Sequence, residues 1–283
     1  MLLSPSSLST VVARLRAAGC VFAEDEARLL IETARTPDDL AAMVDRRVAG
    51  LPLEYVLGWA EFCGLRVAVD PGVFVPRRRT EFLVRRAAAL ARPGAVVVDL
   101  CCGSGALGAA LATMLGAAEP YTAAVDPAGA PACGVDRVEV HAADVDPAAV
   151  ACARRNLAAV GGRAYEGDLY DPLPATLRGR VDVLLANVPY VPTEEVALLP
   201  AEARDHELRV ALDGGADGLD VLRRVTAEAR DWLAPGGVLL SETSDRQVPA
   251  ALEALARGGL SAEVAACEET DATVVIGRLE AAG

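Results

Sequence analysis

The stretch Ala95-Val-Val-Val-Asp-Leu-Cys-Cys-Gly-Ser-Gly105 decides the fold of this chain. Residues 95–100 form an almost continuous apolar run, which is typical of a parallel strand covered on both faces. Two glycines follow, and a helix rich in small residues is predicted from Gly105 to Leu115. Glycines let the backbone approach a ligand closely, and the start of a helix offers free N–H groups. The stretch therefore predicts a strand, a ligand-binding turn and a helix.

The same alternation continues through the rest of the chain. Further strands are predicted at 138–143, 181–186, 238–240 and 272–279, with a short one that ends at Asp168. Helices are predicted over 147–161 and 219–233 and within 248–256. Alternation of this kind predicts an α/β fold with a doubly wound, seven-stranded Rossmann-like sheet. Residues 116–137, rich in alanine, glycine and proline, are predicted to form an irregular insertion.

The first fifty residues have a different pattern. Apolar residues recur at helical spacing from Leu8 to Leu15, and a second helix is predicted over 24–34. Thr36-Pro37 supplies a capping hydroxyl and a proline at the first helical position, so a third helix should run to about Gly50. We expect a helical substrate-recognition domain at 1–50, a β-hairpin linker at 51–79 and the α/β domain at 80–283.

The composition excludes several kinds of chemistry. All 27 basic residues are arginine, so a lysine Schiff base and a P-loop lysine are impossible. The formal charge of -13 argues against a protein that grips duplex nucleic acid by neutralising phosphates. The seven cysteines show no zinc spacing, and neither His141 nor His206 has a catalytic partner nearby in sequence. Since no signal or membrane-spanning pattern is visible, we expect a cytoplasmic protein without a metal ion.

The turn after the first predicted strand has the pattern D-x-C-x-G-x-G. A dinucleotide fingerprint would read G-x-G-x-x-G and would cradle a pyrophosphate. The pattern instead resembles motif I of class I S-adenosylmethionine methyltransferases, with Cys101 where a glycine is usual. The resemblance implies S-adenosylmethionine as the cofactor. The cofactor-binding residues that it implies here are Asp99, Cys101, Cys102, Gly103, Ser104 and Gly105.

A carboxylate should follow the next strand and accept the two ribose hydroxyls of the cofactor. Spacing favours Asp126, which lies about 20 residues further on. Context favours Asp144, because a capped helix follows it at Asp146-Pro147, and we expect Asp144 to take this role. At the end of the third short strand, Asp168 is predicted to accept a hydrogen bond from the adenine amino group, with Leu169 against the ring.

The tetrapeptide Asn187-Val-Pro-Tyr190 ends the strand at 181–186. Ligands of open α/β sheets bind outside the carboxyl ends of the strands, so Asn187 should face both cofactor and substrate. Its side-chain carbonyl and the backbone carbonyl of Val188 are two acceptors for an NH2 group, and Tyr190 can stack on a planar amide. The pattern resembles the N-P-P-Y motif of amino- and amide-nitrogen methyltransferases, which implies that Asn187 and Tyr190 are catalytic and that Val188 and Pro189 help to bind substrate.

Three flanking segments resemble the HemK/PrmC family of protein-(glutamine-N5) methyltransferases. They are Leu53–Leu65, Val75–Val84 and Glu207–Leu219. The resemblance implies methylation of a glutamine in a protein, and the known substrates of the family include the Gly-Gly-Gln loop of class I peptide-chain release factors. Departures at Arg78, Arg79 and Leu208, besides Cys101 and Val188, indicate a divergent paralogue.

Two other functions fit part of the same sequence. An adenine-N6 methyltransferase of DNA or RNA uses the same tetrapeptide, but it should show the broad basic surface that this acidic chain lacks. A non-catalytic binding module with this fold is the third possibility, because Cys101 and Val188 depart from the motifs. The one basic cluster, which contains Arg77-Arg78-Arg79, is either a solvated face or a surface for an acidic partner or ribosomal RNA.

Overall fold

The computed structural model describes residues 5–117 and 138–281. Within these ranges the predicted strands form one seven-stranded sheet in the order β5-β4-β3-β6-β7-β9-β8. Neighbours from β5 to β7 are parallel, whereas β9 runs antiparallel to both β7 and β8. The predicted α/β fold class is confirmed. Asp126 and nearly all of the predicted insertion lie outside the described residues.

The elements have the following bounds. The strands are β1 (Trp59–Phe62), β2 (Leu65–Ala68), β3 (Val96–Leu100), β4 (Glu139–Asp144), β5 (Arg163–Glu166), β6 (Val181–Ala186), β7 (Leu233–Thr243), β8 (Ser261–Cys267) and β9 (Ala272–Arg278). The helices are α1 (Pro5–Ala17), α2 (Ala23–Thr33), α3 (Pro37–Val48), α4 (Leu53–Leu57), α5 (Glu81–Leu90), α6 (Ala106–Ala117), α7 (Pro147–Leu157), α8 (Ala201–His206), α9 (Asp220–Trp232) and α10 (Val248–Arg257).

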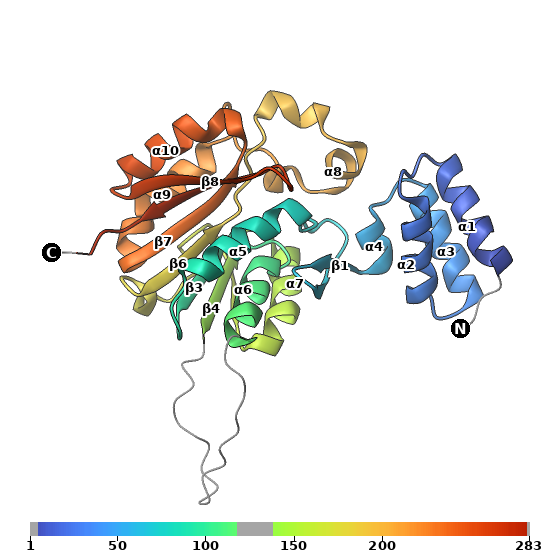
Figure 1. Cartoon of the computed structure of the whole chain (residues 1–283), viewed down its shortest axis with the longest axis horizontal. Coiled ribbons are helices and arrows are strands. Elements are labelled where there is room, and N and C mark those ends of the chain that lie inside the picture. The colour runs from blue at the N-terminus through green and yellow to red at the C-terminus, as the bar shows by residue number, and fades with distance from the viewer. Residues whose placement is uncertain (1–4, 118–137, 282–283) are drawn as a thin grey trace, which may run out of the picture.

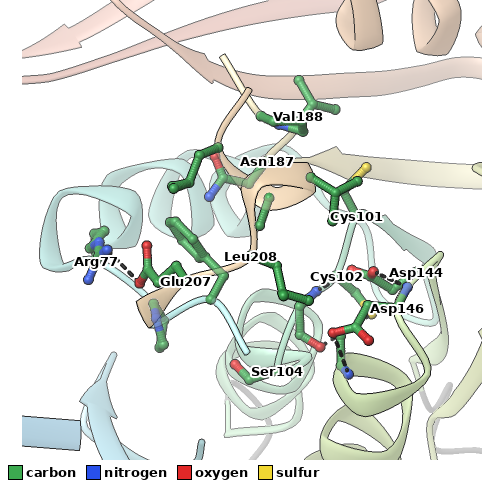
Figure 2. Close-up of a pocket in the computed structure, with 18 of the residues that line it drawn as sticks. Arg77, Cys101, Cys102, Ser104, Asp144, Asp146, Asn187, Val188, Glu207 and Leu208 are labelled. Atoms are coloured by element: carbon green, nitrogen blue, oxygen red, sulfur yellow. Dashed lines mark hydrogen bonds and ion pairs between the residues drawn. The ribbon is translucent and has the colours of Figure 1, made fainter. Parts of the chain in front are cut away.

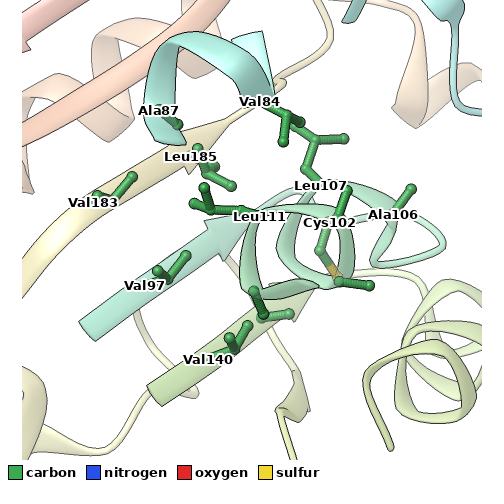
Figure 3. Close-up of a cluster of buried hydrophobic side chains, with 14 of the residues drawn as sticks. Val84, Ala87, Val97, Cys102, Ala106, Leu107, Leu111, Val140, Val183 and Leu185 are labelled. Carbon is green, nitrogen blue, oxygen red and sulfur yellow. The ribbon is translucent and has the colours of Figure 1, made fainter. Parts of the chain in front are cut away.

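Helices cover both faces of the sheet because its strands are apolar on both sides. On one face, Val97 and Leu185 pack with Leu111 of α6 and with residues of α5 and α7 (Figure 3). On the other face, Leu184 packs with α9 and α10, where Trp232 is fully buried. Side chains of successive strand residues point to opposite faces, so each strand contributes to both layers. The result is a three-layer α/β architecture.

The N-terminal helices have a hydrophobic core of their own. Figure 1 shows α1, α2 and α3 at the end of the molecule opposite the large sheet. Their buried cluster includes Leu15 and Leu30 and extends to Val56, so it reaches beyond residue 50 into α4. The hydroxyl of Thr36 accepts a hydrogen bond from the N–H of Asp39 at 3.1 Å, which is the predicted helix cap. A separate domain at 1–50 remains a proposal.

The predicted β-hairpin, β1 with β2, lies between the helical unit and the sheet. Its strands pair antiparallel from Trp59 opposite Ala68 to Phe62 opposite Leu65. Asn156 of α7 holds it: the side-chain oxygen accepts from the N–H of Ala68, and the NH2 group donates to the carbonyls of Ala68 and Ser104. One carboxamide therefore joins the hairpin to the glycine turn.

Four of these helices and strands were not predicted, and one strand was predicted too short. The unpredicted elements are α4, α5, α8 and β8. Pro235-Gly236-Gly237 was expected to be a turn before a strand at 238–240, but β7 already begins at Leu233 and runs to Thr243. Its pairing with β6 shifts register between Leu233 and Val238, so the three residues form an irregularity within the strand. Within the described ranges, none of the helices combines the length and apolarity needed to span a bilayer.

Candidate active site

A cavity of about 690 Å³ opens beyond the carboxyl ends of β3, β4 and β6. Eleven of the predicted site residues line it, and Figure 2 shows several of them around one space. They are Cys101, Cys102, Gly103, Ser104, Asp144, Asp168, Leu169, Asn187, Val188, Pro189 and Tyr190. Further walls come from the linker, around Phe74 and Arg77, and from residues 199–212. The cavity thus joins the predicted cofactor side to a second side built by the linker and this segment.

The turn between β3 and α6 has an unusual backbone. Cys101, Gly103 and Gly105 have φ angles of 53°, 52° and 74°, in the left-handed region that favours glycine. At Gly105 an added Cβ would lie 3.0 Å from the Cβ of Ala153. A side chain there would clash with α7 and push the start of α6 away from it. Cys101 is thus a non-glycine residue in a conformation that costs free energy.

Asp144 lies at the end of β4 and helps to fix this turn. Its Oδ2 accepts a hydrogen bond from the N–H of Gly103 at 2.8 Å, and its Oδ1 accepts from the N–H of Asp146 at 2.9 Å. Burial raises the pKa of Asp144 above its ordinary value. Asp146 caps α7 by accepting from Ala148 and Ala149, as its position before Pro147 predicted. Asp144 itself lines the cavity.

Asp168 and Leu169 lie beside the same space. Leu169 is buried and has a φ of 48°, and it lines the cavity. Asp168 forms an ion pair of 2.6 Å with Arg224 of α9 through Oδ2. The sequence had not indicated this partner. Arg224 occupies Oδ2 of Asp168, so Oδ1 is the oxygen left for the predicted hydrogen bond from an adenine amino group.

Asp99 and Gly105 do not line the cavity. Asp99 is 1% exposed, and its Oδ2 accepts a hydrogen bond from the N–H of Gly108 at 3.0 Å, inside the first turn of α6. Its Oδ1 is buried without a hydrogen-bond partner among the described residues. Burial raises the pKa of this carboxyl to about 8. Any effect of Asp99 on a cofactor is therefore exerted through the position of α6.

Asn187 directly follows β6, and its carboxamide faces the cavity (Figure 2). Its Oδ1 is buried and has no hydrogen-bond partner among the described residues. A half-turn about the Cβ–Cγ bond exchanges the two ends of such an amide, so either end can meet a ligand. A buried acceptor without a partner is costly, and a bound N–H donor removes this cost.

Tyr190 is held by two residues that the sequence did not single out as site residues. Its hydroxyl donates to Oε1 of Glu242 at 2.8 Å and accepts from Nη2 of Arg79. Nε of Arg79 also donates to Oε1 of Glu242, at 2.9 Å. Glu242 lies on β7 and is 3% exposed, so an acid close after the apolar run Val238-Leu-Leu240 was the signal that could have identified it.

Glu207 connects the linker to the segment 199–212. Its Oε1 accepts from the N–H of Val75 at 3.1 Å and from Nη2 of Arg77 at 2.6 Å. The Glu207 side chain is 1% exposed, and burial raises its pKa despite the nearby guanidinium of Arg77. Leu208, which stands where the family has proline, lines the cavity beside it. Arg77 and Arg79 thus bind buried carboxylates, although the Arg79 side chain is itself 46% exposed, and Arg78 is exposed as well.

The charges on the cofactor side fit an adenosine ligand with a cationic centre. Asp144, Asp146 and Asp168 line that side, and its one arginine, Arg224, is paired with Asp168. A pyrophosphate would meet three carboxylates there, which is unfavourable. The site therefore suits S-adenosylmethionine and does not suit a dinucleotide.

Comparison with known proteins gives a consistent result, although no family model matches the chain. A release factor glutamine methyltransferase of Geobacter sulfurreducens is 38% identical over 228 residues, which cover 79% of this chain and 72% of the relative. One of Mycolicibacterium smegmatis is 36% identical over 247 residues, 86% of this chain and 80% of the relative. A 4-amino-L-phenylalanine/4-methylamino-L-phenylalanine methyltransferase of Streptomyces pristinaespiralis is 35% identical over 242 residues, with coverages of 82% and 75%.

The solved structures bear on the fold alone. A methyltransferase from Pyrococcus furiosus superposes with a TM-score of 0.52 at 19% identity, covering 77% of this chain and 90% of its own. Fold and site together define an S-adenosylmethionine-dependent methyltransferase of the α/β class. The identity and coverage of the relatives go further: the chain belongs to the release factor glutamine methyltransferase family, as its motifs had indicated.

Proposed function

We propose that this protein transfers a methyl group from S-adenosylmethionine to the side-chain N5 of a glutamine in the Gly-Gly-Gln loop of a class I peptide-chain release factor. The observation that carries the proposal is the unpartnered Oδ1 of Asn187 at the end of β6, beside the glycine turn. Family membership supports the same substrate, because its relatives are named for it. The reaction belongs in the cytoplasm, where its substrate takes part in translation.

The cofactor is assigned to the side of the cavity that contains the glycine turn. S-adenosylmethionine, when bound, supplies an electrophilic methyl group. Asp144 accepts the ribose hydroxyls, and Leu169 forms an apolar wall for the adenine. The free oxygen of Asp168 accepts from the adenine amino group while Arg224 holds the other. Asp99 acts indirectly, because its hydrogen bond with Gly108 fixes the first turn of α6.

Asn187 and Val188 are assigned to the amide of the substrate glutamine. The lone pair of an amide nitrogen is delocalised into its carbonyl, so the nitrogen is a poor nucleophile. Two carbonyl acceptors hold the NH2 group and favour the positive charge that develops on the nitrogen. Orientation of this kind can contribute roughly 7–11 kcal/mol, and one preorganised hydrogen bond about 3–4 kcal/mol. The ring of Tyr190 supports the planar amide.

The methylated nitrogen does not need a dedicated base. Its proton becomes acidic once the new bond to carbon has formed, and it can pass to water. The two histidines, His141 and His206, do not line the cavity, which agrees with this assignment.

The test uses purified release factor and labelled S-adenosylmethionine, with mass spectrometry of the Gly-Gly-Gln peptide. Wild-type protein should add one methyl group to the glutamine. Asn187→Ala should bind the cofactor within about threefold of wild type, since it removes an acceptor from the substrate, and should lose at least about 100-fold in turnover. Methylation of the peptide by Asn187→Ala at the wild-type rate would falsify the role of this residue.

A second substrate class is favoured by one comparison. The relative from Streptomyces pristinaespiralis is named for the methylation of an aromatic amine on an amino acid. The same two acceptors can hold an aniline NH2 group, so 4-amino-L-phenylalanine belongs in the assay beside the release factor. If the protein methylates the free amino acid and does not methylate the release factor, the proposed substrate is wrong. The proposed methyl transfer to an NH2 nitrogen would still hold.

A further inference from the structure

Three residues far apart in the sequence form a closed network at the wall of the cavity. They are Arg79 of the linker, Tyr190 after β6 and Glu242 of β7. Oε1 of Glu242 accepts from both the guanidinium and the phenol, while the guanidinium also donates to the phenol oxygen. The Arg79 guanidinium lies 5.8 Å from the centre of the Tyr190 ring. Hence each pair in the trio is in direct contact.

The network holds one end of Tyr190 while a separate contact holds the other. Nε2 of Gln247 donates to the backbone carbonyl of Tyr190 at 2.8 Å. The backbone is therefore fixed by Gln247, and the hydroxyl by Arg79 and Glu242. Loss of the guanidinium leaves the backbone contact and the Tyr190–Glu242 hydrogen bond in place, but removes the second contact that fixes the phenol oxygen.

Arg79 also balances a charge that would otherwise be uncompensated. The carboxylate of Glu242 is 3% exposed, and its Oε2 has no hydrogen-bond partner among the described residues. A buried carboxylate without a cation is strongly unfavourable. Arg79 stands where the resembled family has a glutamate, so in this chain the charge at position 79 is reversed and directed at Glu242.

We propose that Arg79 is a positioning residue for methyl transfer, which acts through Glu242 and Tyr190 to hold the tyrosine ring against the substrate amide. The inference rests on the proposed function, in which Tyr190 supports the amide. Arg79 itself need not touch the reacting atoms. Its contribution belongs to turnover rather than to cofactor affinity, because the cofactor is assigned to the opposite side of the cavity.

The experiment compares four variants on the release factor. Arg79→Ala removes one of the two contacts of the Tyr190 hydroxyl and the cation beside Glu242, and it should lower kcat at least tenfold, with the dissociation constant of S-adenosylmethionine within twofold of wild type. Arg79→Glu places a second carboxylate beside Glu242 and should lower kcat further. The added change Glu242→Gln removes the repulsion, so Arg79→Glu/Glu242→Gln should be at least threefold faster than Arg79→Glu. The matched control is Arg78→Glu, at an exposed neighbour outside the cavity wall, with kcat within twofold of wild type.

The outcomes separate this inference from the proposed function. A kcat for Arg79→Ala within twofold of wild type overturns the inference, as does the absence of rescue by Glu242→Gln. If wild-type protein does not methylate the release factor, the proposed function fails, and the thermal unfolding midpoints of Arg79→Ala, Tyr190→Phe and the double variant then decide. If the midpoint shift of the double variant is smaller than the sum of the two single shifts, Arg79 and Tyr190 are coupled and the network is retained. A double-variant shift equal to that sum overturns the network.

Discussion

The backbone N–H of Gly103 donates a hydrogen bond of 2.8 Å to Oδ2 of Asp144, across 41 residues of sequence. Gly103 follows β3 and Asp144 ends β4, and these two strands are parallel neighbours in the sheet. The contact makes the glycine turn and the carboxylate one rigid unit. A ligand that needs both therefore meets a site that is already assembled, which lowers the cost of ordering it.

Asp144→Asn should weaken S-adenosylmethionine binding by about tenfold or more, since a hydrogen bond to a charged acceptor contributes roughly 1.5–3 kcal/mol. Asparagine keeps an oxygen for Gly103, so the turn should survive. Isothermal calorimetry measures the affinity, and Asp171→Asn, at an exposed residue outside the cavity wall, is the control. An affinity equal to that of wild type would assign the ribose hydroxyls to another group.

Cys101→Gly should stabilise the protein by up to about 1 kcal/mol. A side chain in the left-handed region costs about 1–2 kcal/mol, which exceeds the cost of about 0.5–1 kcal/mol for ordering a glycine. Cys102→Gly is the matched control: it removes a side chain that is 5% exposed, so it should destabilise. Urea unfolding measures both. A loss of stability in Cys101→Gly would show that the contacts of the thiol outweigh the backbone strain.

Asp99→Asn should change the pH dependence of stability. The folded protein keeps Asp99 protonated up to about pH 8, whereas the unfolded chain ionises it near the ordinary pKa of about 4. Folding therefore takes up a proton between these values, and this contribution to stability is lost as the pH rises. The variant lacks this titration. As the pH rises through this range, the free energy of unfolding of the variant relative to that of wild type should therefore increase by up to about 1.4 kcal/mol per pH unit. Urea unfolding from about pH 5 to about pH 8 tests the slope, and a constant difference would contradict it.

Glu207→Gln should destabilise the contact between the linker and the segment 199–212 by about 1–2 kcal/mol. Glutamine keeps an acceptor for the N–H of Val75 but leaves Arg77 without its carboxylate. The Michaelis constant for the protein substrate should rise, because this contact builds the substrate side of the cavity. Unfolding and steady-state kinetics provide the two measurements, with Glu194→Gln, at an exposed position, as the control. If the free energy of unfolding and the Michaelis constant are both unchanged, Glu207 does not shape the substrate side of the cavity.

Much of the sheet could be predicted because its strands are buried on both faces. Continuous apolar runs such as 95–100 and 181–186 are a local signal, and the structure has strands there. Strand β8 could not be found in this way, because Ser261–Cys267 is mostly exposed and is defined by its pairing with β9. One proline and two glycines at 235–237 indicated a break, but pairing with β6 on both sides of them continues β7.

In the candidate site, too, features with a local sequence signal could be predicted, whereas features that depend on long-range contacts could not. Motifs within a few residues identified the turn at Cys101–Gly105 and the tetrapeptide at Asn187–Tyr190, and the cavity brings both together. Arg224 beside Asp168 and Glu242 beside Tyr190 depend on contacts across 56 and 52 residues. No local pattern records such a partner, because it is chosen by the packing of the sheet and its helices.

The carboxamide of Asn156 contacts Ala68 of the hairpin and Ser104 of the glycine turn at once. The hairpin and the glycine turn of the proposed cofactor site therefore share one side chain. If substrate binding draws the hairpin toward the cavity, the free energy of that displacement is felt at the turn, and the effect is reciprocal by thermodynamic linkage. Cofactor affinity measured with and without the release factor should then differ, and Asn156→Ala should make the two values equal.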